Sequence, residues 1–404
     1  MSEHNKNVPK IRFPGFTDAW EQRRLSTISN STYGGGTPKT GEAPFWGGNL
    51  PWVQTSDISE DILYVNGPKK TITESGLNNS AAKLVPANSI AVVTRVGVGK
   101  LAFMPYEYAT SQDFLSLSDL NVDSWFGTYL LYKLLQKEKN AVQGTSIKGI
   151  TKEGLLSMNI IIPTDREEQE EIGSFFKELD HLITLHQRKL NHLQDEKKGL
   201  LQKMFPKEGE DFPELRFPGY TEAWEQRKAV SIFQTVSDKN HPELPVLSAS
   251  QELGMIRRDQ IGIDIKYDEK STKTYKRVTP GQFVIHLRSF QGGFAHSNVE
   301  GITSPAYTVL DFKDKSRHDD KFWREVFTSS IFIKHLETVT YGIRDGRSIS
   351  FTDFSTLKFY FPSFEEQKKI GEFFNQLDHL ITLHQRKLEH LQDRKKALLQ
   401  QMFI

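Results

Sequence analysis

The stretch Gly97-Val98-Gly99-Lys100 has residue types that could bind phosphate, because glycine amides followed by a lysine occur in nucleotide-binding loops. Such a loop begins with a glycine five residues before the glycine that precedes the lysine. A Ser or Thr directly after the lysine holds magnesium. In this chain Thr94 occupies the first of these positions and Leu101 the last. The motif is therefore incomplete and does not predict nucleotide binding.

Other residues that could act as catalysts or metal ligands are also poorly placed. His181, His186 and His192 lie 5 and 6 residues apart, so a helix does not bring their imidazoles to one face. Asp268-Glu269-Lys270 resembles a fragment of a nuclease site, but its partner residues are not identifiable. The chain has no cysteine nucleophile, and it lacks the Asp/Asn-Pro-Pro-aromatic tetrad with which amino-methyltransferases hold a flipped adenine. The sequence thus predicts neither catalysis nor a metal site.

Arginine, glutamine, serine and threonine gather instead in the loops of two divergent regions, and such side chains read base edges in DNA. Arg95 and Arg288 coincide when the two regions are aligned, although a shared structural ion pair would also preserve them. An ordinary surface position is the alternative for each candidate. The candidate DNA-contacting residues are Gln54, Thr55, Ser56, Arg95, Gln112 and Lys148 in the first region, and Ser248, Ser250, Gln251, Arg288, Gln291, Arg344 and Arg347 in the second.

Short strands and turns are the elements that must position these residues. Leu50–Ile58 and Leu244–Gln251 each have the pattern of a buried strand that runs into a polar loop. Ser89–Phe103 aligns with Gln282–His296 at an offset of 193, and both predict a strand, a glycine-bearing turn and a second strand. A helical stretch then follows in each region, over 124–138 and 321–338, and a last apolar strand precedes a long helix.

The long helix itself is repeated. The segment from Glu167 matches the segment from Glu365 at roughly 30 of 39 positions, and LDHLITLHQRKL is identical in both. Apolar residues lie 3 and 4 apart, which predicts a coiled-coil seam, with two simple core helices as the alternative. The predicted seam residues are Phe176, Leu179, Ile183, His186, Leu190 and Leu193 in the first copy, and Phe374, Leu377, Ile381, His384, Leu388 and Leu391 in the second. Lys197 and Lys395 interrupt the seam at equivalent positions.

An opening motif, RFPGFTDAWEQR near Trp20 and RFPGYTEAWEQR near Trp224, completes the repeat, and we expect both tryptophans to pack in the core. The predicted organisation is a disordered tail at 1–8, a domain at 9–163, a helix at 164–206, a second domain at 207–362 with a linker at 207–212, and a helix at 363–404. With 404 residues, a net charge of +1, no cysteine and no long apolar run, the chain is expected to be cytoplasmic, without a membrane partner.

These motifs together resemble the specificity subunit of a type I restriction-modification enzyme. The resemblance covers the opening motifs, LPWVQTSDI, GTSIKGIT from Gly144, and the helical motif EEQ-x-x-IG-x-FF-x-x-LD-x-LI-x-LHQRKL. In the second half, the corresponding segment has diverged to LPVLSASQ. The resemblance implies an α/β (α+β) fold with two tandem target recognition domains of mixed β-sheet and short helices. It also implies two long helices that separate these domains as an antiparallel coiled coil with pseudo-two-fold symmetry.

The resemblance further implies a non-catalytic reader of a bipartite, asymmetric site in double-stranded DNA. Its partners would be two methyltransferase (modification) subunits and two restriction/translocase subunits. S-adenosylmethionine, ATP and Mg would be bound by those partners, and this chain would carry no cofactor. Two alternatives from other classes are a coiled-coil scaffold or adaptor without DNA binding and a diverged nuclease. Clustered base-reading side chains favour the DNA reader over the scaffold, and the missing catalytic cluster disfavours the nuclease.

Overall fold

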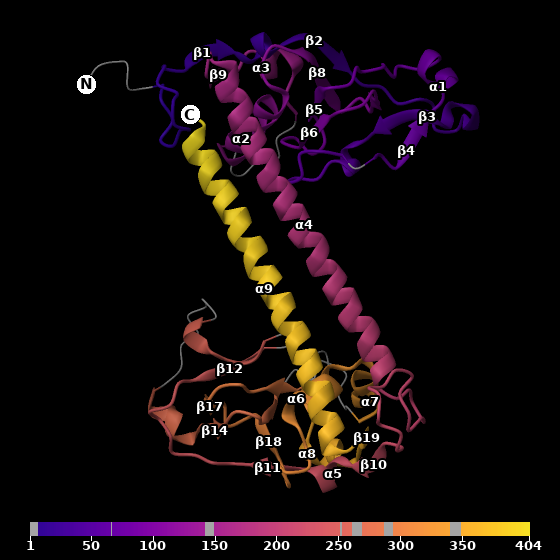
Figure 1. Cartoon of the computed structure of the whole chain (residues 1–404), viewed down its shortest axis with the longest axis vertical. Coiled ribbons are helices and arrows are strands. Elements are labelled where there is room, and N and C mark those ends of the chain that lie inside the picture. Colours follow the sequence, from indigo (N-terminus) through magenta and orange to yellow (C-terminus); the bar gives the residue numbers. More distant parts are fainter. Residues whose placement is uncertain are drawn as a thin grey trace. The chain divides into compact units, whose positions relative to one another are not determined.

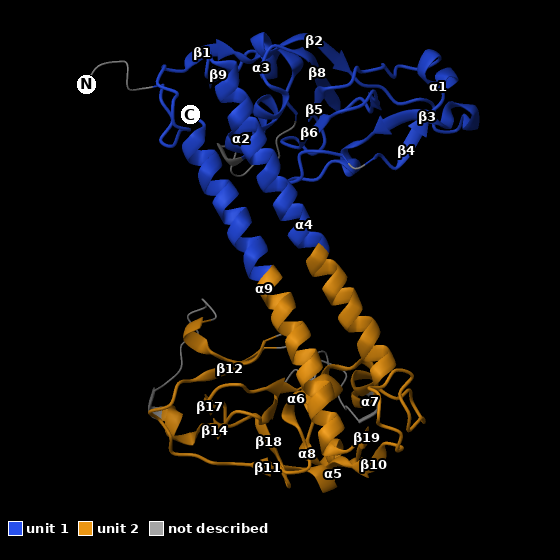
Figure 2. Cartoon of the chain, viewed as in Figure 1, with its two compact units in different colours: residues 1–188, 385–404 blue, residues 189–384 orange. Residues whose placement is uncertain are grey.

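The computed structural model describes residues 7–65, 67–141, 149–250, 253–260, 269–286, 294–339 and 349–404. The chain divides into two compact units, unit 1 (residues 1–188 and 385–404) and unit 2 (residues 189–384) (Figure 2). Each unit contains one domain and a part of both long helices, α4 (Arg166–Met204) and α9 (Phe364–Met402). The organisation predicted from the sequence assigned domains and long helices to separate segments. In the structure each compact unit contains a domain and parts of both helices, because the domain shares a hydrophobic core with them.

In unit 1 a four-stranded antiparallel sheet has the order β2-β8-β5-β6 (Figure 1). A second sheet has the order β4-β3-β7, with β3 and β7 parallel. Strands β1 and β9 form a separate antiparallel pair that leads into α4. The strands are β1 (Glu21–Arg24), β2 (Ser29–Gly34), β3 (Trp46–Val53), β4 (Lys70–Ile72), β5 (Ser89–Val93), β6 (Leu101–Met104), β7 (Ala109–Thr110), β8 (Phe114–Leu120) and β9 (Asn159–Ile162); the short helices are α1 (Glu74–Asn78), α2 (Ser124–Ala141) and α3 (Lys152–Leu156).

Unit 2 repeats this plan, with a four-stranded sheet of order β11-β18-β15-β16 and the pairs β10-β19, β14-β17 and β12-β13. The strands are β10 (Glu225–Lys228), β11 (Phe233–Val236), β12 (Leu247–Ser250), β13 (Gly254–Arg257), β14 (Lys276–Val278), β15 (Phe283–Ile285), β16 (Ala295–His296), β17 (Gly301–Thr303), β18 (Thr308–Phe312) and β19 (Lys358–Phe361); the short helices are α5 (Ala229–Ile232), α6 (Asp320–Thr328), α7 (Ser330–Val339) and α8 (Phe351–Thr356). The mixed α/β domains therefore have the predicted fold class.

The structure corrects one local prediction in unit 2 and delimits another. The helical stretch expected over 321–338 is broken at Ser329, whose backbone is extended (φ −68°, ψ 146°) and whose Oγ accepts a hydrogen bond from Phe332 N at 3.2 Å. This serine caps a second helix and so interrupts the first. Within Leu244–Gln251, where a strand running into a polar loop was expected, the strand is β12 (Leu247–Ser250), and it pairs with β13 in a hairpin.

The opening motif of each half is attached to the start of the long helix through a buried glutamate. Arg12 forms two hydrogen bonds with the Glu168 carboxylate, at 2.6 and 2.8 Å, and Trp20 Nε1 donates a third at 3.2 Å. Arg216 makes the equivalent pair with Glu366, at 2.7 Å for both bonds. Both tryptophans are buried, Trp20 near Phe126 and Phe403 and Trp224 near Phe205 and Phe322, which agrees with the predicted packing role.

The next residues of the helical motif hold the first turn of a domain helix. In unit 1, Gln169 Oε1 accepts from Asp123 N at 2.9 Å, and Asp123 Oδ1 in turn caps Phe126 N at 2.8 Å. Gly173 lies directly beneath this turn, since a Cβ there would be 2.4 Å from Asp123 Oδ1 and 2.7 Å from Phe126 N. Gln367, Asp319 and Gly371 repeat the arrangement in unit 2. The repeated motif thus encodes a joint between helix and domain.

Within each unit the parts of α4 and α9 run in opposite directions. In unit 1 the ring of Phe176 lies 5.8 Å from that of Phe403, and Asp180, later in α4, pairs with Lys395, earlier in α9. In unit 2, Phe205 and Phe374 lie 6.3 Å apart and Lys197 pairs with Asp378. Among the predicted seam residues, Phe176, Leu179, Leu190, Leu193, Phe374, Leu377, Leu388 and Leu391 are buried, and Ile183, His186, Ile381 and His384 are half-buried.

Candidate nucleic-acid interface

Three turns of unit 1 meet at one end of its sheets. Ser111 N donates to Val53 O at 2.9 Å, which joins the turn after β7 to the end of β3. Thr94 N donates to Asp113 O at 2.7 Å, which joins the same turn to the end of β5. Lys100 Nζ donates to Ile58 O at 3.1 Å and ties the β5–β6 turn to the segment after β3. We call residues 54–58, 94–100 and 111–113 the unit 1 loop cluster.

Five of the predicted reader residues lie on this loop cluster. Arg95, Ser56 and Gln112 are exposed, while Gln54 and Thr55 are half-buried. The structure therefore brings together side chains from three separate stretches of sequence, each followed or preceded by a buried strand. Because loops on a rigid sheet present polar groups to solvent, this arrangement suits contact with a polar surface such as a DNA groove.

The Gln54–Ser56 turn is fixed by a residue that the sequence analysis did not single out. Gln54 N donates to Asp57 Oδ2 at 3.0 Å, and Asp57 N donates to Gln54 O at 2.9 Å. Asp57 thereby closes a short 3-10 turn, Thr55–Asp57, and orients the side chains before it. The signal that could have revealed this role is the acidic residue three positions after a polar one, as in a capping box.

In unit 2 the predicted readers Ser248 and Ser250 lie on the β12–β13 hairpin. Both side chains are half-buried. Ser248 Oγ accepts from Arg258 Nε at 3.1 Å, and Ser250 Oγ accepts from Leu253 N at 3.2 Å. These hydroxyls thus help to shape the hairpin, which sits where unit 1 has its turn after β3. The predicted readers Lys148, Gln251, Arg288, Gln291, Arg344 and Arg347 lie outside the described residues.

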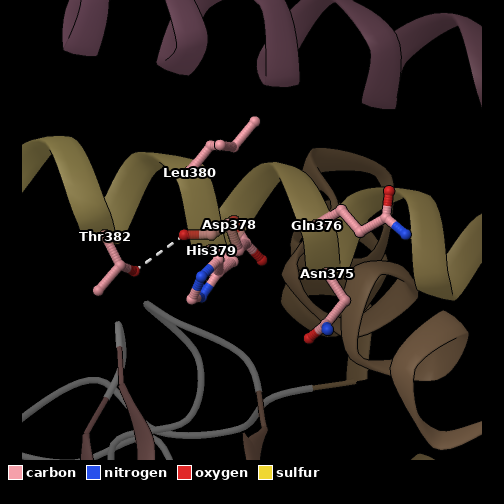
Figure 3. Close-up of a pocket in the computed structure, with 6 residues that line it drawn as sticks. All are labelled: Asn375, Gln376, Asp378, His379, Leu380 and Thr382. Carbon is pink, nitrogen blue, oxygen red and sulfur yellow. Dashed lines mark hydrogen bonds between the residues drawn. The ribbon is translucent and has the colours of Figure 1, made fainter.

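A surface hollow of 570 Å³ lies along α9 in unit 2, lined by Asn375, Gln376, Asp378, His379, Leu380 and Thr382 (Figure 3). Figure 3 shows His379 and Thr382 on one side of the helix and Leu380 on the other; Thr382 Oγ1 donates to Asp378 O at 2.8 Å. The Asp378 carboxylate is already paired with Lys197 and Arg324, at 2.6 and 2.7 Å. Among the described residues that line the hollow, the only carboxylate is therefore already engaged in ion pairs.

Two further properties hold for the residues that the structure describes. No group of three or more His, Cys, Asp or Glu side chains among them is arranged to hold a metal ion. No helix formed by these residues combines the length and the apolar character needed to cross a membrane.

Comparison with known proteins gives matches in both halves of the chain. A family model described as the type I restriction modification DNA specificity domain matches residues 17–195 and, a second time, residues 224–393. The MjaIX specificity subunit of Methanocaldococcus jannaschii is 24% identical over 254 residues, which cover 59% of this chain and 57% of that protein. The EcoR124I/EcoR124II specificity subunit of Escherichia coli is 29% identical over 164 residues, which cover 38% of this chain and 40% of that protein.

Solved structures show that the fold extends over nearly the whole chain. The S subunit of a type I restriction-modification system from M. genitalium has a TM-score of 0.64 at 14% identity, covering 98% of this chain and 99% of that one. A chain from a structure concerned with complex assembly and conformational transition of the type I system has a TM-score of 0.51 at 16% identity, with coverage of 98% and 99%.

Proposed function

Because the chain belongs to the family of type I restriction-modification DNA specificity domains, we propose that it is the DNA-recognition subunit of a type I restriction-modification complex. In this proposal each domain reads one half of a bipartite site in double-stranded DNA. The chain itself is non-catalytic. It determines which sequence is bound, and its partners carry out the chemistry.

The observation that carries this proposal is the double match to the family, once in each half, with one domain and one long helix in each matched segment. The reading surface of unit 1 is its loop cluster, and that of unit 2 includes the β12–β13 hairpin. A 3-10 turn after β3 in one unit and a hairpin in the other present different side chains. We therefore expect the two half-sites to differ in sequence, so that the complete site is asymmetric.

The partners in this proposal are two modification subunits and two restriction/translocase subunits. The modification subunits would bind S-adenosylmethionine and methylate adenine, and the restriction subunits would use ATP and Mg. The net charge of +1 supports such an assembly, because a chain without excess positive charge leaves much of the phosphate neutralisation to its partners. The long helices would dock the modification subunits and set the number of unread base pairs between the half-sites.

The alternative of a scaffold without DNA binding is less well supported, since the family matched in both halves is defined by DNA specificity. The test is to map methylated adenines in cells that express this chain with its modification partner, and in cells that express the partner alone. We expect one bipartite motif to be methylated only when this chain is present. Methylation of the same motif without the chain would contradict the proposal. A stable complex that methylates no defined motif would support the scaffold instead.

A further inference from the structure

Two apolar side chains stand out from the surface of the domains. Val96 in unit 1 is 75% exposed and Leu253 in unit 2 is 67% exposed, the highest values for any large apolar residue in the described ranges. The next is Leu383, at 51%, on α9. Each of the two domains therefore carries one such residue, and each residue lies at a turn.

Val96 lies on a turn that the unit 1 loop cluster holds in place. Val98 N donates to Arg95 O at 3.2 Å, and Lys100 N donates to Gly97 O at 3.3 Å. Gly97 has a positive φ of 91° and lies against the turn after β3, since a Cβ at this glycine would be 2.8 Å from Thr55 Cγ2. The Val96 side chain thus projects from a supported position next to the predicted readers Arg95 and Thr55.

Leu253 also lies at a turn, directly before strand β13 of the β12–β13 hairpin. Its backbone N–H donates to Ser250 Oγ at 3.2 Å. The following Gly254 has a φ of 72°, and a Cβ there would be 2.3 Å from His296 O, so this end of the hairpin presses against β16. Leu253 is therefore presented by the same hairpin that carries the predicted readers Ser248 and Ser250.

The residues around both side chains are polar or charged. Val96 follows the exposed Arg95, and Lys100 lies in the same turn. In the hairpin that carries Leu253, Ser248 and Ser250 lie on the partner strand, and Arg257, which pairs with Asp259 at 2.8 Å, stands at the far end. A single apolar side chain among such groups is too small for the apolar centre of a protein interface. It matches the one apolar group that base edges offer in the major groove, the 5-methyl group of thymine.

We infer that Val96 and Leu253 are specificity-determining residues that each contact the 5-methyl group of a thymine, one in each half-site. The inference rests on the proposed function, because a site methylated on adenine in both halves contains an A·T pair, and hence a thymine, in each half. Burial of a methyl group against an apolar side chain removes both from water and favours thymine over cytosine at that position.

The test measures binding of the complete complex, this chain with its modification partner, to duplexes that carry the mapped site. Each thymine of the site is replaced in turn by uracil, which lacks only the methyl group. The variants Val96→Asn and Leu253→Asn replace the apolar side chain by a polar one that has no methyl group. Val230→Asn and Leu84→Asn are matched controls, because these residues are also exposed, at 43% and 42%, and lie outside the reading surfaces.

For the unaltered chain we expect uracil at one position in each half-site to weaken binding about fourfold, which corresponds to about 0.8 kcal/mol for one buried methyl group. Val96→Asn should abolish this sensitivity in one half-site and Leu253→Asn in the other, while the controls retain both. If both variants keep the same uracil sensitivity as the unaltered chain, the inference is wrong although site recognition persists. Failure of the unaltered chain to distinguish the site from a scrambled duplex would overturn the proposed function as well.

Discussion

Lys395 Nζ lies 2.6 Å from Asp180 Oδ1, and the two side chains are only 8% and 9% exposed. Lys395 belongs to α9 and Asp180 to α4. Tyr129 of the domain donates its hydroxyl to Asp180 Oδ2 at 2.7 Å, so the pair joins both helices to the domain of unit 1. Burial raises the pKa of Asp180, and the Lys395 ammonium opposes that rise. The lysine that interrupts the apolar pattern of the sequence is therefore the partner of a buried carboxylate.

Removal of this lysine should destabilise unit 1 strongly. Lys395→Met leaves Asp180 buried without a cation, and breaking a buried pair in this way costs about 3–5 kcal/mol. Lys197→Met should lower the stability of unit 2 by less, because Asp378 and Glu325 remain paired with Arg324, at 2.7 Å in each pair. Urea unfolding of both variants measures the difference. The double variant Lys395→Met with Asp180→Asn should recover part of the loss, and equal effects of both single variants would argue against this account.

The glycines of the long helix provide a matched pair of substitutions. Gly173→Ala should destabilise unit 1, because its Cβ would clash with Asp123 Oδ1 and Phe126 N and displace the first turn of α2. Gly199→Ala has nothing within 4 Å of the new Cβ, and the second copy of the repeat has Ala397 at this position. It should stabilise α4 by up to about 1 kcal/mol. Thermal unfolding of the two variants compares them, and a shift in the same direction for both would refute the proposed joint.

Part of the fold was predictable from the sequence. The strands that precede the glycine turns were predictable, since β-branched and aromatic residues predominate in β5 and β15. The repeated helical motif was also recognisable in the sequence, but the residues that it contacts in the domain were not. Gln169, Gly173 and Glu168 each contact residues far away in sequence, and spacing within one helix carries no information about which residues those are.

Acid should destabilise unit 2 through His318. Burial lowers the pKa of His318 to about 4, below the ordinary value of 6.5. As the pH falls from 6.5 to about 4, the unfolded chain takes up a proton that the folded chain excludes, so folding stability decreases. The imidazole is partly exposed, which limits the loss to about 1–2 kcal/mol.

The measurement is urea unfolding at several pH values for the unaltered chain and for His318→Gln, which does not titrate. The variant should lose less stability between pH 6.5 and pH 4. His241→Gln is the control with the opposite sign, because a hydrogen bond with Asp238 raises the pKa of His241 and its contribution is lost as pH rises. Parallel stability curves for His318→Gln and the unaltered chain would contradict the role of His318.

Arg95→Ala should relax recognition at one half-site only. A bidentate contact of arginine with guanine contributes about 1–3 kcal/mol of discrimination, and the exposed Arg95 lies on the unit 1 loop cluster. Arg23→Ala is the control, since Arg23 pairs with Glu21 on β1, outside that cluster. Mapping of methylated adenines reports the motif of each variant. An unchanged motif with unchanged methylation would show that Arg95 is not a reader.

The candidate reading surface was only partly predictable from sequence. Residue type indicated Gln54, Thr55, Ser56, Arg95 and Gln112, and the structure places them on one loop cluster. The role of Asp57 in closing the turn, and the exposure of Val96, depend on how three turns pack against one another. In unit 2, the residue at which the strand within Leu244–Gln251 ends was not predictable, because the serines and alanine of Ser248–Ser250 are weak strand formers and pairing with β13 decides their conformation.

Independent reading by the two domains is the central claim, and an exchange of one domain tests it most directly. Residues 212–362 are replaced by the corresponding domain of a relative that keeps the equivalents of Arg216 and Asp319, which attach this domain to α9. Methylated adenines are then mapped in cells that also express the modification partner. We expect one half-site of the motif to change and the other to be preserved. A folded chimera that binds its partner and alters both half-sites would contradict independent reading.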